Sequence, residues 1–424
     1  MKLKGVFLYM YLYHNIENDH NINVEEIFAR QQIIQKIKQR FSTYGYNEIS
    51  TSAFESYDLY AKMNGTVNHH EMIKTIDNTG KVLVLRPDIT IPITQQIARN
   101  TTALEKDLRY FYVLDVFRQT AETKEYREST QAGVEYFGNP HAEADAEIIA
   151  LAIHLLQDLQ VSNFKIELGH AGFFKQLVAE MNLDEQDLQE LKRNIQAKNI
   201  TEIEQSLTQL SVNSEMKEIV TSLPFLYGSP QDVIKRAKKL PLTTEMIQTL
   251  TNLQNIYQVL ESYGVEKHVV IDLSLINHMD YYSDIIFQGF IEKVGKPILM
   301  GGRYNTLANQ FNADLPAIGF ACDVDFLISG LREEILPKMN QLNIILLFEK
   351  STEKVGLQLA NLLRNKKYHV LTYPITTNRN RIPKSQVTIS IKKGQQSLIF
   401  DNEQYPFTTE QEVITLLQQI RERK

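Results

Sequence analysis

The apolar residues of segment 24–44 recur at a spacing close to that of an α-helix. They are Ile27, Phe28, Ile33, Ile34, Ile37 and Phe41. Because a helix brings residues three and four apart onto one face, this pattern predicts a helix with one buried side. Gly45, which follows the segment directly, is typical of a helix end.

Apolar and β-branched runs predict strands in the next hundred residues. The segment "KVLVLRPDITIPITQQIA" indicates a strand that meets Pro87 and a helix that follows. Two further strands are predicted in "LRYFYVLDVFRQ" and "QAGVEYFG", and the charged loop 119–129 joins them into a hairpin. The acidic stretch "HAEADAE" at 141–147 opens a long apolar helix, where carboxylates are ordinary partners of the helix dipole and do not indicate a metal.

The pattern changes twice in the second half of the chain. Segment 171–262 consists of long polar helical patterns and is interpreted as a helical insertion. Strand patterns return in "HVVIDLSL", "DIIFQGFI" and "KPILMGGRYN", and "PAIGFACDVDFLISGLREEI" predicts a strand that runs into a helix. From about residue 341 to 424, mixed strand and helix patterns predict a separate, small α/β domain.

Composition narrows the class of protein. With 424 residues, 43% of them hydrophobic, the chain exceeds what one core usually holds, so two or three domains are expected. No apolar run approaches the roughly 18 residues that span a bilayer, and we expect a cytoplasmic protein with no membrane partner. The single cysteine, Cys322, agrees with a reducing compartment. A net charge of −6 disfavours a nucleic-acid partner, since such proteins normally carry a basic face.

Five motifs resemble, in order and spacing, those of the class II histidyl-tRNA synthetases. They are "RPDIT" at 86–90, "FRQT…YREST QAGVEYFG" at 117–138, "DYY" at 280–282, "GGRYN" at 301–305 and "AIGFACDVDFL" at 317–327. The resemblance implies an α+β fold in which a six-stranded antiparallel sheet is flanked by helices. It implies a catalytic-core domain at 1–335 that contains the helical insertion at about 171–262, and a C-terminal α/β domain at 341–424 in the place of an anticodon-binding domain.

The positions that hold ATP phosphates in these synthetases are altered in this chain. Formation of an aminoacyl-adenylate needs fixed cations around the phosphates, and the family supplies three arginines. The resemblance places Arg118 at the first position, Asn277 at the second and Phe326 at the third. Asp323 and Asp325 stand in the run that precedes Phe326. Because each lost cation costs on the order of 10²–10³ in rate, we expect no aminoacylation activity.

The positions that hold the amino acid in these synthetases are kept. An ammonium group favours carboxylate partners, and an imidazole needs one donor and one acceptor. The resemblance implies a histidine-binding set of Asp88, Thr90, Arg118, Gln131, Glu135, Tyr281, Tyr282 and Tyr304. Asp88 is one methylene shorter than the family's usual glutamate. His278 has no other histidine or cysteine at ligand spacing, so we expect neither a metal nor a cofactor.

One branch of this family combines a kept histidine pocket with lost activation residues: the regulatory subunits of ATP phosphoribosyltransferase. The resemblance implies a non-catalytic subunit required for the first step of histidine biosynthesis and for feedback regulation by L-histidine. It implies a hetero-oligomer with a separate, short-form catalytic subunit and a homodimeric core, with Ser52 in the place of the proline of the family's dimer-forming motif. Two alternatives stay open: an active histidyl-tRNA synthetase, favoured by the C-terminal domain, and a free-standing histidine-sensing or tRNA-binding module.

Overall fold

The computed structural model describes residues 24–61, 63, 67–99, 106–119, 128–181, 183–210, 212–276, 281–292, 294–331 and 343–422. The chain divides into two compact units, residues 1–337 and 338–424. None of the described helices is both long and apolar enough to cross a lipid bilayer. Across these same residues, no group of three or more His, Cys, Asp or Glu side chains is placed to hold a metal ion.

The first predicted helix is α2, Val24–Thr43. Its buried residues, which recur at helical spacing, are Ala29, Ile33, Ile37 and Phe41. They allow α2 to pack against helix α5 (Ala142–Asp158) and strand β5 (Leu108–Phe117). Ile27, which was predicted on this face, is 49% exposed because it lies outside the arc that the four buried residues form. Gly45 follows the helix with a φ of +81°, a conformation that favours glycine.

A nine-stranded sheet forms the centre of the first unit, in the order β1-β5-β6-β12-β11-β10-β7-β9-β8. The six strands from β5 to β7 in this order pair antiparallel, which confirms the six-stranded antiparallel sheet that the resemblance implies. Strands β1 and β9 add parallel pairs at its edges. The remaining strand bounds are Asn47–Glu48 (β1), Glu128–Phe137 (β6), Phe164–His170 (β7), Tyr227–Gly228 (β8), Val269–Asp272 (β9), Ile285–Ile291 (β10), Leu299–Arg303 (β11) and Ala317–Asp323 (β12).

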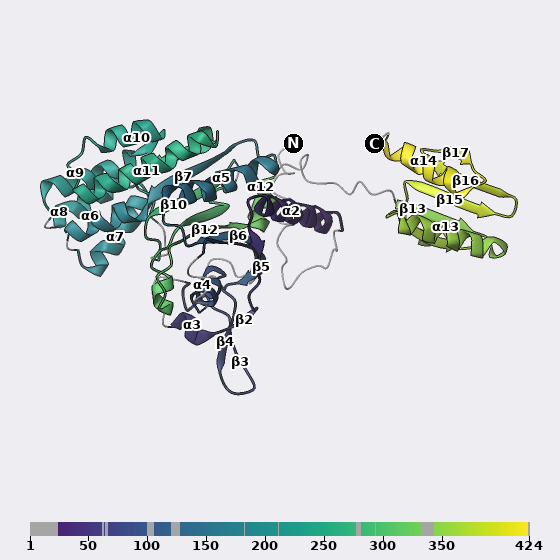
Figure 1. Ribbon diagram of the computed structural model, residues 1–424, viewed down its shortest axis with the longest axis horizontal. Coiled ribbons are helices and arrows are strands. Elements are labelled where there is room, and N and C mark those ends of the chain that lie inside the picture. The colour runs from purple at the N-terminus through teal and green to yellow at the C-terminus, as the bar shows by residue number, and fades with distance from the viewer. Residues whose placement is uncertain are drawn as a thin grey trace. The chain divides into compact units, whose positions relative to one another are not determined.

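Helices cover one face of this sheet. Helix α5 packs on β6 and β12, and α2 and α11 pack on α5 (Figure 1). The predicted insertion is helical, and its helices gather beyond one end of the sheet (Figure 1). Their bounds are Ala171–Met181 (α6), Glu185–Gln196 (α7), Ile200–Gln209 (α8), Ser214–Ser222 (α9), Leu223–Phe225 (η2), Pro230–Ala237 (α10) and Thr244–Ser262 (α11), followed by Glu266–His268 (η3). Helix α12, Val324–Gly330, packs on β6 and α2.

A second hydrophobic cluster lies on the opposite face of the sheet. Phe111 belongs to the helix-covered cluster and Tyr112 to the second one, because neighbouring residues of a strand point to opposite faces. The elements on this side are the small sheet β2-β4-β3 (Phe54–Ser56, Val82–Leu85 and Lys74–Ile76), helices α3 (Tyr57–Ala61) and α4 (Thr90–Ala98), and the turn η4 (Ala308–Phe311). Five buried tyrosines belong to this cluster: Tyr60, Tyr112, Tyr281, Tyr282 and Tyr304.

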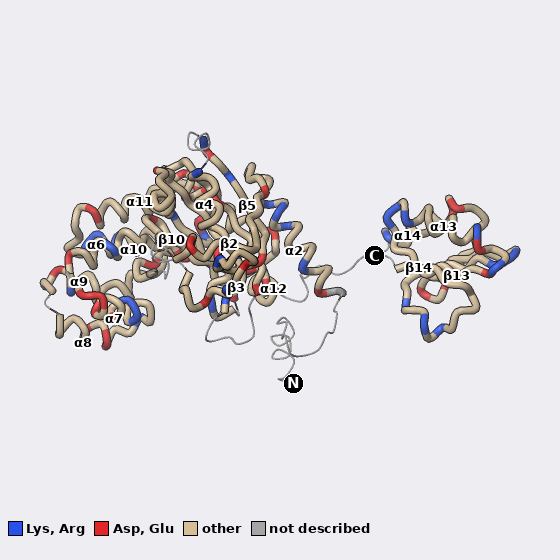
Figure 2. The backbone as a smooth tube through the Cα atoms, turned by 90° about the horizontal axis from the view of Figure 1, so that it is seen from below, with Lys and Arg blue, Asp and Glu red and all other residues tan. Residues whose placement is uncertain are grey.

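The second unit is an α/β structure with a five-stranded sheet in the order β14-β13-β15-β16-β17. Its elements are Asn343–Phe348 (β13), Lys350–Thr352 (η5), Glu353–Asn365 (α13), His369–Pro374 (β14), Arg379–Arg381 (η6), Val387–Lys392 (β15), Gln395–Phe400 (β16), Glu403–Pro406 (β17) and Glu410–Glu422 (α14). Residues 338–424 contain 14 Lys and Arg but only 7 Asp and Glu. Figure 2 marks in blue and red the basic and acidic residues of the described part of this unit. The acidic net charge of the whole chain therefore belongs to the first unit alone.

Candidate functional site

Residues from five separate segments converge on the tyrosine-rich face of the large sheet. Asp88 and Thr90 lie at the start of α4, and Gln131 and Glu135 lie on β6. Tyr281 and Tyr282 precede β10, Tyr304 follows β11, and Arg118 follows β5. Three further positions of the sequence comparison, Asn277, His278 and Asp280, lie outside the described residues.

Glu135 stands at the centre of this group. Its side chain is 2% exposed; the Thr90 hydroxyl donates a hydrogen bond to Oε1 at 2.6 Å, and the Tyr304 hydroxyl donates one to Oε2. Gly319 on the paired strand β12 lies directly opposite, and a Cβ there would collide with the carboxylate. Burial raises the pKa of Glu135 to about 8, although both hydrogen bonds oppose the rise. The carboxyl group is therefore mostly protonated at neutral pH.

Asp88 is the second buried acid of the site. Its Oδ1 accepts a hydrogen bond of 2.8 Å from the backbone N–H of Ile91, in the first turn of α4. Burial raises the pKa of Asp88, and the nearby positive charge of Arg118 opposes the rise. Arg118 donates from Nε to the carbonyl oxygen of Pro87 at 2.8 Å, which holds its guanidinium beside the start of this segment. One acid and one base thus lie together at this end of the site.

Packed aromatic rings enclose the two acids. The ring centroids of Tyr281 and Tyr282 are 4.7 Å apart, and those of Tyr281 and Tyr304 are 5.9 Å apart at 79°, an edge-to-face arrangement. Burial raises the pKa of each of these hydroxyls, so all three stay neutral. Gln131 shares a face of β6 with Glu135 and is half-buried, but it makes no side-chain hydrogen bond with the other site residues that the structure describes.

Tyr112 belongs to this site and was not predicted. It is 1% exposed, and it lies opposite Gly133 in the β5–β6 pair, where a Cβ would collide with its hydroxyl. The negative charges of Glu135 and Asp88, added to burial, raise its pKa. The alternation of "LRYFYVLDVF" carries a signal that identifies it. Once β5 and β6 form a hairpin, Tyr112 must share the face of Glu135.

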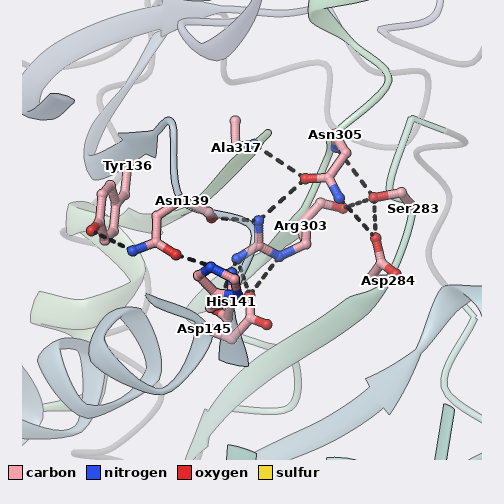
Figure 3. Close-up of polar contacts among 9 residues, drawn as sticks. All are labelled: Tyr136, Asn139, His141, Asp145, Ser283, Asp284, Arg303, Asn305 and Ala317. Atoms are coloured by element: carbon pink, nitrogen blue, oxygen red, sulfur yellow. Dashed lines mark hydrogen bonds and ion pairs between the residues drawn. The ribbon is translucent and has the colours of Figure 1, made fainter. Parts of the chain in front are cut away.

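A buried ion pair holds the backbone next to the tyrosines. Arg303 and Asp145 are each 2% exposed at the side chain, and they are joined at 2.7 Å between Nη2 and Oδ1 (Figure 3). Arg303 also donates to the carbonyl oxygen of Asn139 at 2.9 Å and to Oδ1 of Asn305 at 3.2 Å. Asn305 reaches Oδ2 of Asp284 at 3.2 Å. The network therefore ties Tyr304, next to Arg303, to the segment that carries Tyr281 and Tyr282.

The positions corresponding to the phosphate side of a synthetase are engaged in other contacts. The Asp325 carboxylate pairs with Arg30 of α2 at 3.2 Å and accepts a hydrogen bond from the backbone N–H of Thr130. Asp323 accepts from the first backbone N–H groups of α12. The Lys296 ammonium lies 3.5 Å from the ring centroid of Phe326. Asp325 and the Phe326 ring thus lie on this side, and the Arg30 guanidinium is paired with Asp325.

A separate open hollow of about 750 Å³ lies between α3, α4 and η4. It is lined by Glu55, Ser56, Asp58, Leu59, Met63, Gln95, Arg99, Gln310 and Phe311. None of the predicted site residues is among them, so the hollow is distinct from the site around Glu135.

Comparisons with known proteins show the family of this chain. The family model described as Histidyl-tRNA synthetase matches residues 20–327, which include every predicted site residue. An ATP phosphoribosyltransferase regulatory subunit of Oceanobacillus iheyensis is 42% identical over 86% of this chain and 89% of its own length. One of Ruminiclostridium cellulolyticum is 32% identical over 84% of this chain and 85% of its own length.

Two solved structures have the same fold. A crystal structure titled as an ATP phosphoribosyltransferase regulatory subunit/histidyl-tRNA synthetase from Bacillus halodurans matches with a TM-score of 0.75 and 28% identity, covering 86% of this chain and 94% of that chain. Histidyl-tRNA synthetase from Nostoc sp. PCC 7120 matches with a TM-score of 0.77, covering 97% of this chain and 100% of that chain. At 19% identity, the second likeness shows the fold alone.

Replacement of Arg303 by methionine should destabilise the first unit by about 3–5 kcal/mol, because it leaves the buried Asp145 carboxylate without its partner. The double variant Arg303→Met/Asp145→Leu should recover part of this loss. Urea unfolding of the variants measures both effects. As a control, Lys38→Met removes the exposed ion pair with Glu48 and should change stability by no more than about 0.5 kcal/mol. Equal effects of the two single variants would contradict the importance of the buried pair.

The free energy of unfolding should fall as the pH rises from about 5 to 8 because of Glu135. Its pKa is about 8 in the folded chain and near the ordinary 4.5 when unfolded, so in this range only the folded chain holds the proton. The slope from this group is at most about 1.4 kcal/mol per pH unit. Glu135→Gln has no such titration. The free energy of unfolding, measured at several pH values, should rise for the variant relative to the wild type as the pH increases to 8. The same pH dependence in both proteins would refute the raised pKa.

Proposed function

The chain belongs to the family of ATP phosphoribosyltransferase regulatory subunits, within the wider histidyl-tRNA synthetase family, and we propose that it regulates its enzyme through L-histidine bound around Glu135. The relatives are named as regulatory subunits, so the role of this chain in histidine biosynthesis is regulatory and not catalytic. The observation that carries the proposal is the fully buried Glu135 carboxyl, held by Thr90 and Tyr304 among packed tyrosines.

The Glu135 end of the site suits an imidazole. An imidazole ring presents one N–H donor and one acceptor nitrogen, and the Glu135 carboxyl together with a tyrosine hydroxyl can supply the matching pair. The flat aromatic walls of Tyr281, Tyr282 and Tyr304 suit the faces of a small ring. Because Glu135 is buried and can change protonation near neutral pH, it can meet a neutral or a charged ring.

The Asp88 end of the site suits the amino-acid group of histidine. An ammonium would find the Asp88 carboxylate, and a carboxylate would find the Arg118 guanidinium beside it. Buried charges are stabilised when they are paired, so a ligand that carries both signs completes this end better than a ligand with one charge. This complementarity favours free histidine over an imidazole that lacks the amino-acid group.

The partner that we propose is a separate, short-form ATP phosphoribosyltransferase catalytic subunit, assembled with a homodimeric core of this chain. The names of the relatives support a partnership with that enzyme. We place the complex in the cytoplasm, which agrees with the buried, free Cys322. Nucleic acid is not part of the proposed function, although the basic charge of residues 338–424 favours weak, salt-sensitive attraction to any polyanion.

Regulation through this pocket requires that histidine distinguish two states of the complex. A ligand with equal affinity for both states shifts neither, however tightly it binds. Coupling between two sites is typically about 1–3 kcal/mol, or about 5–150-fold in affinity. Thr90 opens α4, and Tyr281 and Tyr282 lead into β10, so the ligand would contact segments that pack on different elements. A small shift of these segments is the proposed route of coupling.

Glu135→Ala should weaken histidine inhibition of the reconstituted complex by about 5–150-fold and leave its assembly and uninhibited turnover intact. The substitution removes the carboxyl that faces the ligand and keeps the backbone of β6. The measurement is the histidine inhibition constant of complexes made with each subunit. Glu128→Ala, at the exposed start of the same strand, is the matched control. Histidine should inhibit the complex that contains this variant as strongly as it inhibits the wild-type complex. Unchanged inhibition of the complex with Glu135→Ala would mean that histidine does not act through this pocket.

The purified chain should show no histidine-dependent exchange of pyrophosphate into ATP and should form no histidyl-tRNA. The resemblance puts Asn277 and Phe326 at two of the three positions where fixed cations would have to stabilise the phosphates, and the nearby Arg30 is paired with Asp325. The assay is run at a histidine concentration that saturates binding in a parallel thermal-shift titration. Exchange at a rate comparable to that of an ordinary synthetase would return the chain to the catalytic branch of the family.

A further inference from the structure

Tyr60 carries an unexplained buried hydroxyl. The residue lies on α3 and is 0% exposed, and its hydroxyl has no hydrogen-bond partner among the described residues. An unpaired buried hydroxyl destabilises the folded state, so native structures contain few of them. A phenylalanine would fill the same apolar space without this cost. The residues that the structure describes supply no partner for this hydroxyl, and a bound ligand could supply one.

The surroundings of Tyr60 identify where that partner would lie. Its ring belongs to the same hydrophobic cluster as Tyr112, Tyr281, Tyr282 and Tyr304. Burial raises the pKa of the Tyr60 hydroxyl; the negative charges of Asp88 and Glu55 add to the rise, and the positive charges of Arg86 and Arg118 oppose it. Two of these four charged residues, Asp88 and Arg118, form the polar end of the site, and the ring of Tyr60 is buried in the same cluster as the site tyrosines. The other buried side-chain atoms without partners in the described residues lie on α6, α11 and η3, on Gln176, Asn252 and Glu266.

We propose that the Tyr60 hydroxyl accepts a hydrogen bond from the α-ammonium group of the bound ligand. An ammonium carries three N–H donors and needs three acceptors when it is buried. Asp88 offers one, and the Thr90 oxygen, which donates its own hydrogen to Glu135 and is hydrogen-bonded to the Tyr112 hydroxyl, keeps one lone pair. Tyr60 completes the set. This inference rests on the proposed function. It adds Tyr60 as a residue that recognises the α-ammonium group of the amino acid.

The length of Asp88 strengthens this assignment. Its carboxylate is tied through Oδ1 to the backbone N–H of Ile91, so it cannot turn freely toward a ligand. A short, anchored acid leaves part of an ammonium uncovered, and a neighbouring neutral oxygen covers it without adding a further buried negative charge. Because burial raises the pKa of the Tyr60 hydroxyl, it stays neutral and can accept from the ligand through its oxygen.

The test is Tyr60→Phe, which removes one oxygen and keeps the ring. The affinity for L-histidine, measured by calorimetry on the full chain, should fall about ten- to hundredfold, the usual range for a hydrogen bond to a charged group. The free energy of unfolding without ligand should stay the same or rise, because the variant loses an unpaired buried hydroxyl. Tyr57→Phe is the matched control on the same helix. Its hydroxyl is bonded to Nδ1 of His69 at 3.1 Å, and its loss should leave histidine affinity unchanged.

Two analogues locate the contact on the ligand. Histamine keeps the ammonium and lacks the carboxylate, and imidazolepropionate keeps the carboxylate and lacks the ammonium. Tyr60→Phe should weaken histamine as much as histidine and should leave imidazolepropionate unaffected. Equal loss for imidazolepropionate would overturn the assignment to the ammonium. Equal histidine affinity of Tyr60→Phe and wild type, or a less stable ligand-free variant, would overturn the inference and leave the pocket standing. A wild-type chain that binds no histidine would overturn the proposed function itself.

Discussion

The burial of one carboxyl group, that of Glu135, is the constraint on which the site depends. Strand β6 lies inside the antiparallel sheet, so water cannot solvate a side chain on its covered faces. A buried acid must be neutral or must find partners, and Glu135 does both: its pKa rises to about 8, and Thr90 and Tyr304 donate to its two oxygens. These partners come from segments far apart in the chain. The two hydrogen bonds to the Glu135 carboxyl therefore hold α4 and the end of β11 in place relative to β6.

A second buried polar network extends this order to the remaining walls. Arg303 directly precedes Tyr304, and its ion pair with Asp145 anchors the end of β11 to the first turn of α5 (Figure 3). Through Asn305 and Asp284, the same network reaches the segment after Tyr282. Lys175 of α6 adds a hydrogen bond of 2.7 Å to the carbonyl oxygen of Tyr282. The segments that carry the tyrosines are therefore held by a network of buried polar groups that hydrogen-bond to one another. Such a network favours a single arrangement of the rings.

The positions that the resemblance assigns to the amino-acid side and to the phosphate side of a synthetase site differ in their contacts. The amino-acid side holds buried acids, hydroxyls and aromatic rings, and it is here that we propose that histidine binds. On the phosphate side, the charged groups are paired within the chain. Arg30 forms an ion pair with Asp325, Asp323 caps α12, and the Lys296 ammonium lies over the Phe326 ring. The ion pair of Arg30 with Asp325 joins α2 to α12. This division is the physical counterpart of a regulatory subunit within a family of synthetases.

The sequence by itself determined the family, the fold class and the regulatory role, and the comparisons confirm these predictions. Periodic burial is a local signal, so α2, the β5–β6 hairpin and the helical insertion could be predicted from short windows. Strand β7 was missed although Phe164, Ile166 and Leu168 alternate, and net charge averaged over the chain concealed the basic residues 338–424.

Only the tertiary structure decided which polar groups meet. Asp145 was interpreted as an ordinary helix-terminal acid, but it is the buried partner of Arg303, 158 residues away. Asp325 pairs with Arg30 across 295 residues, and Tyr60, whose local pattern predicts packing alone, is buried in the same cluster as the site tyrosines. Burial makes each polar group seek a partner wherever the folded chain brings one, and periodicity along the sequence carries no information about that distant residue.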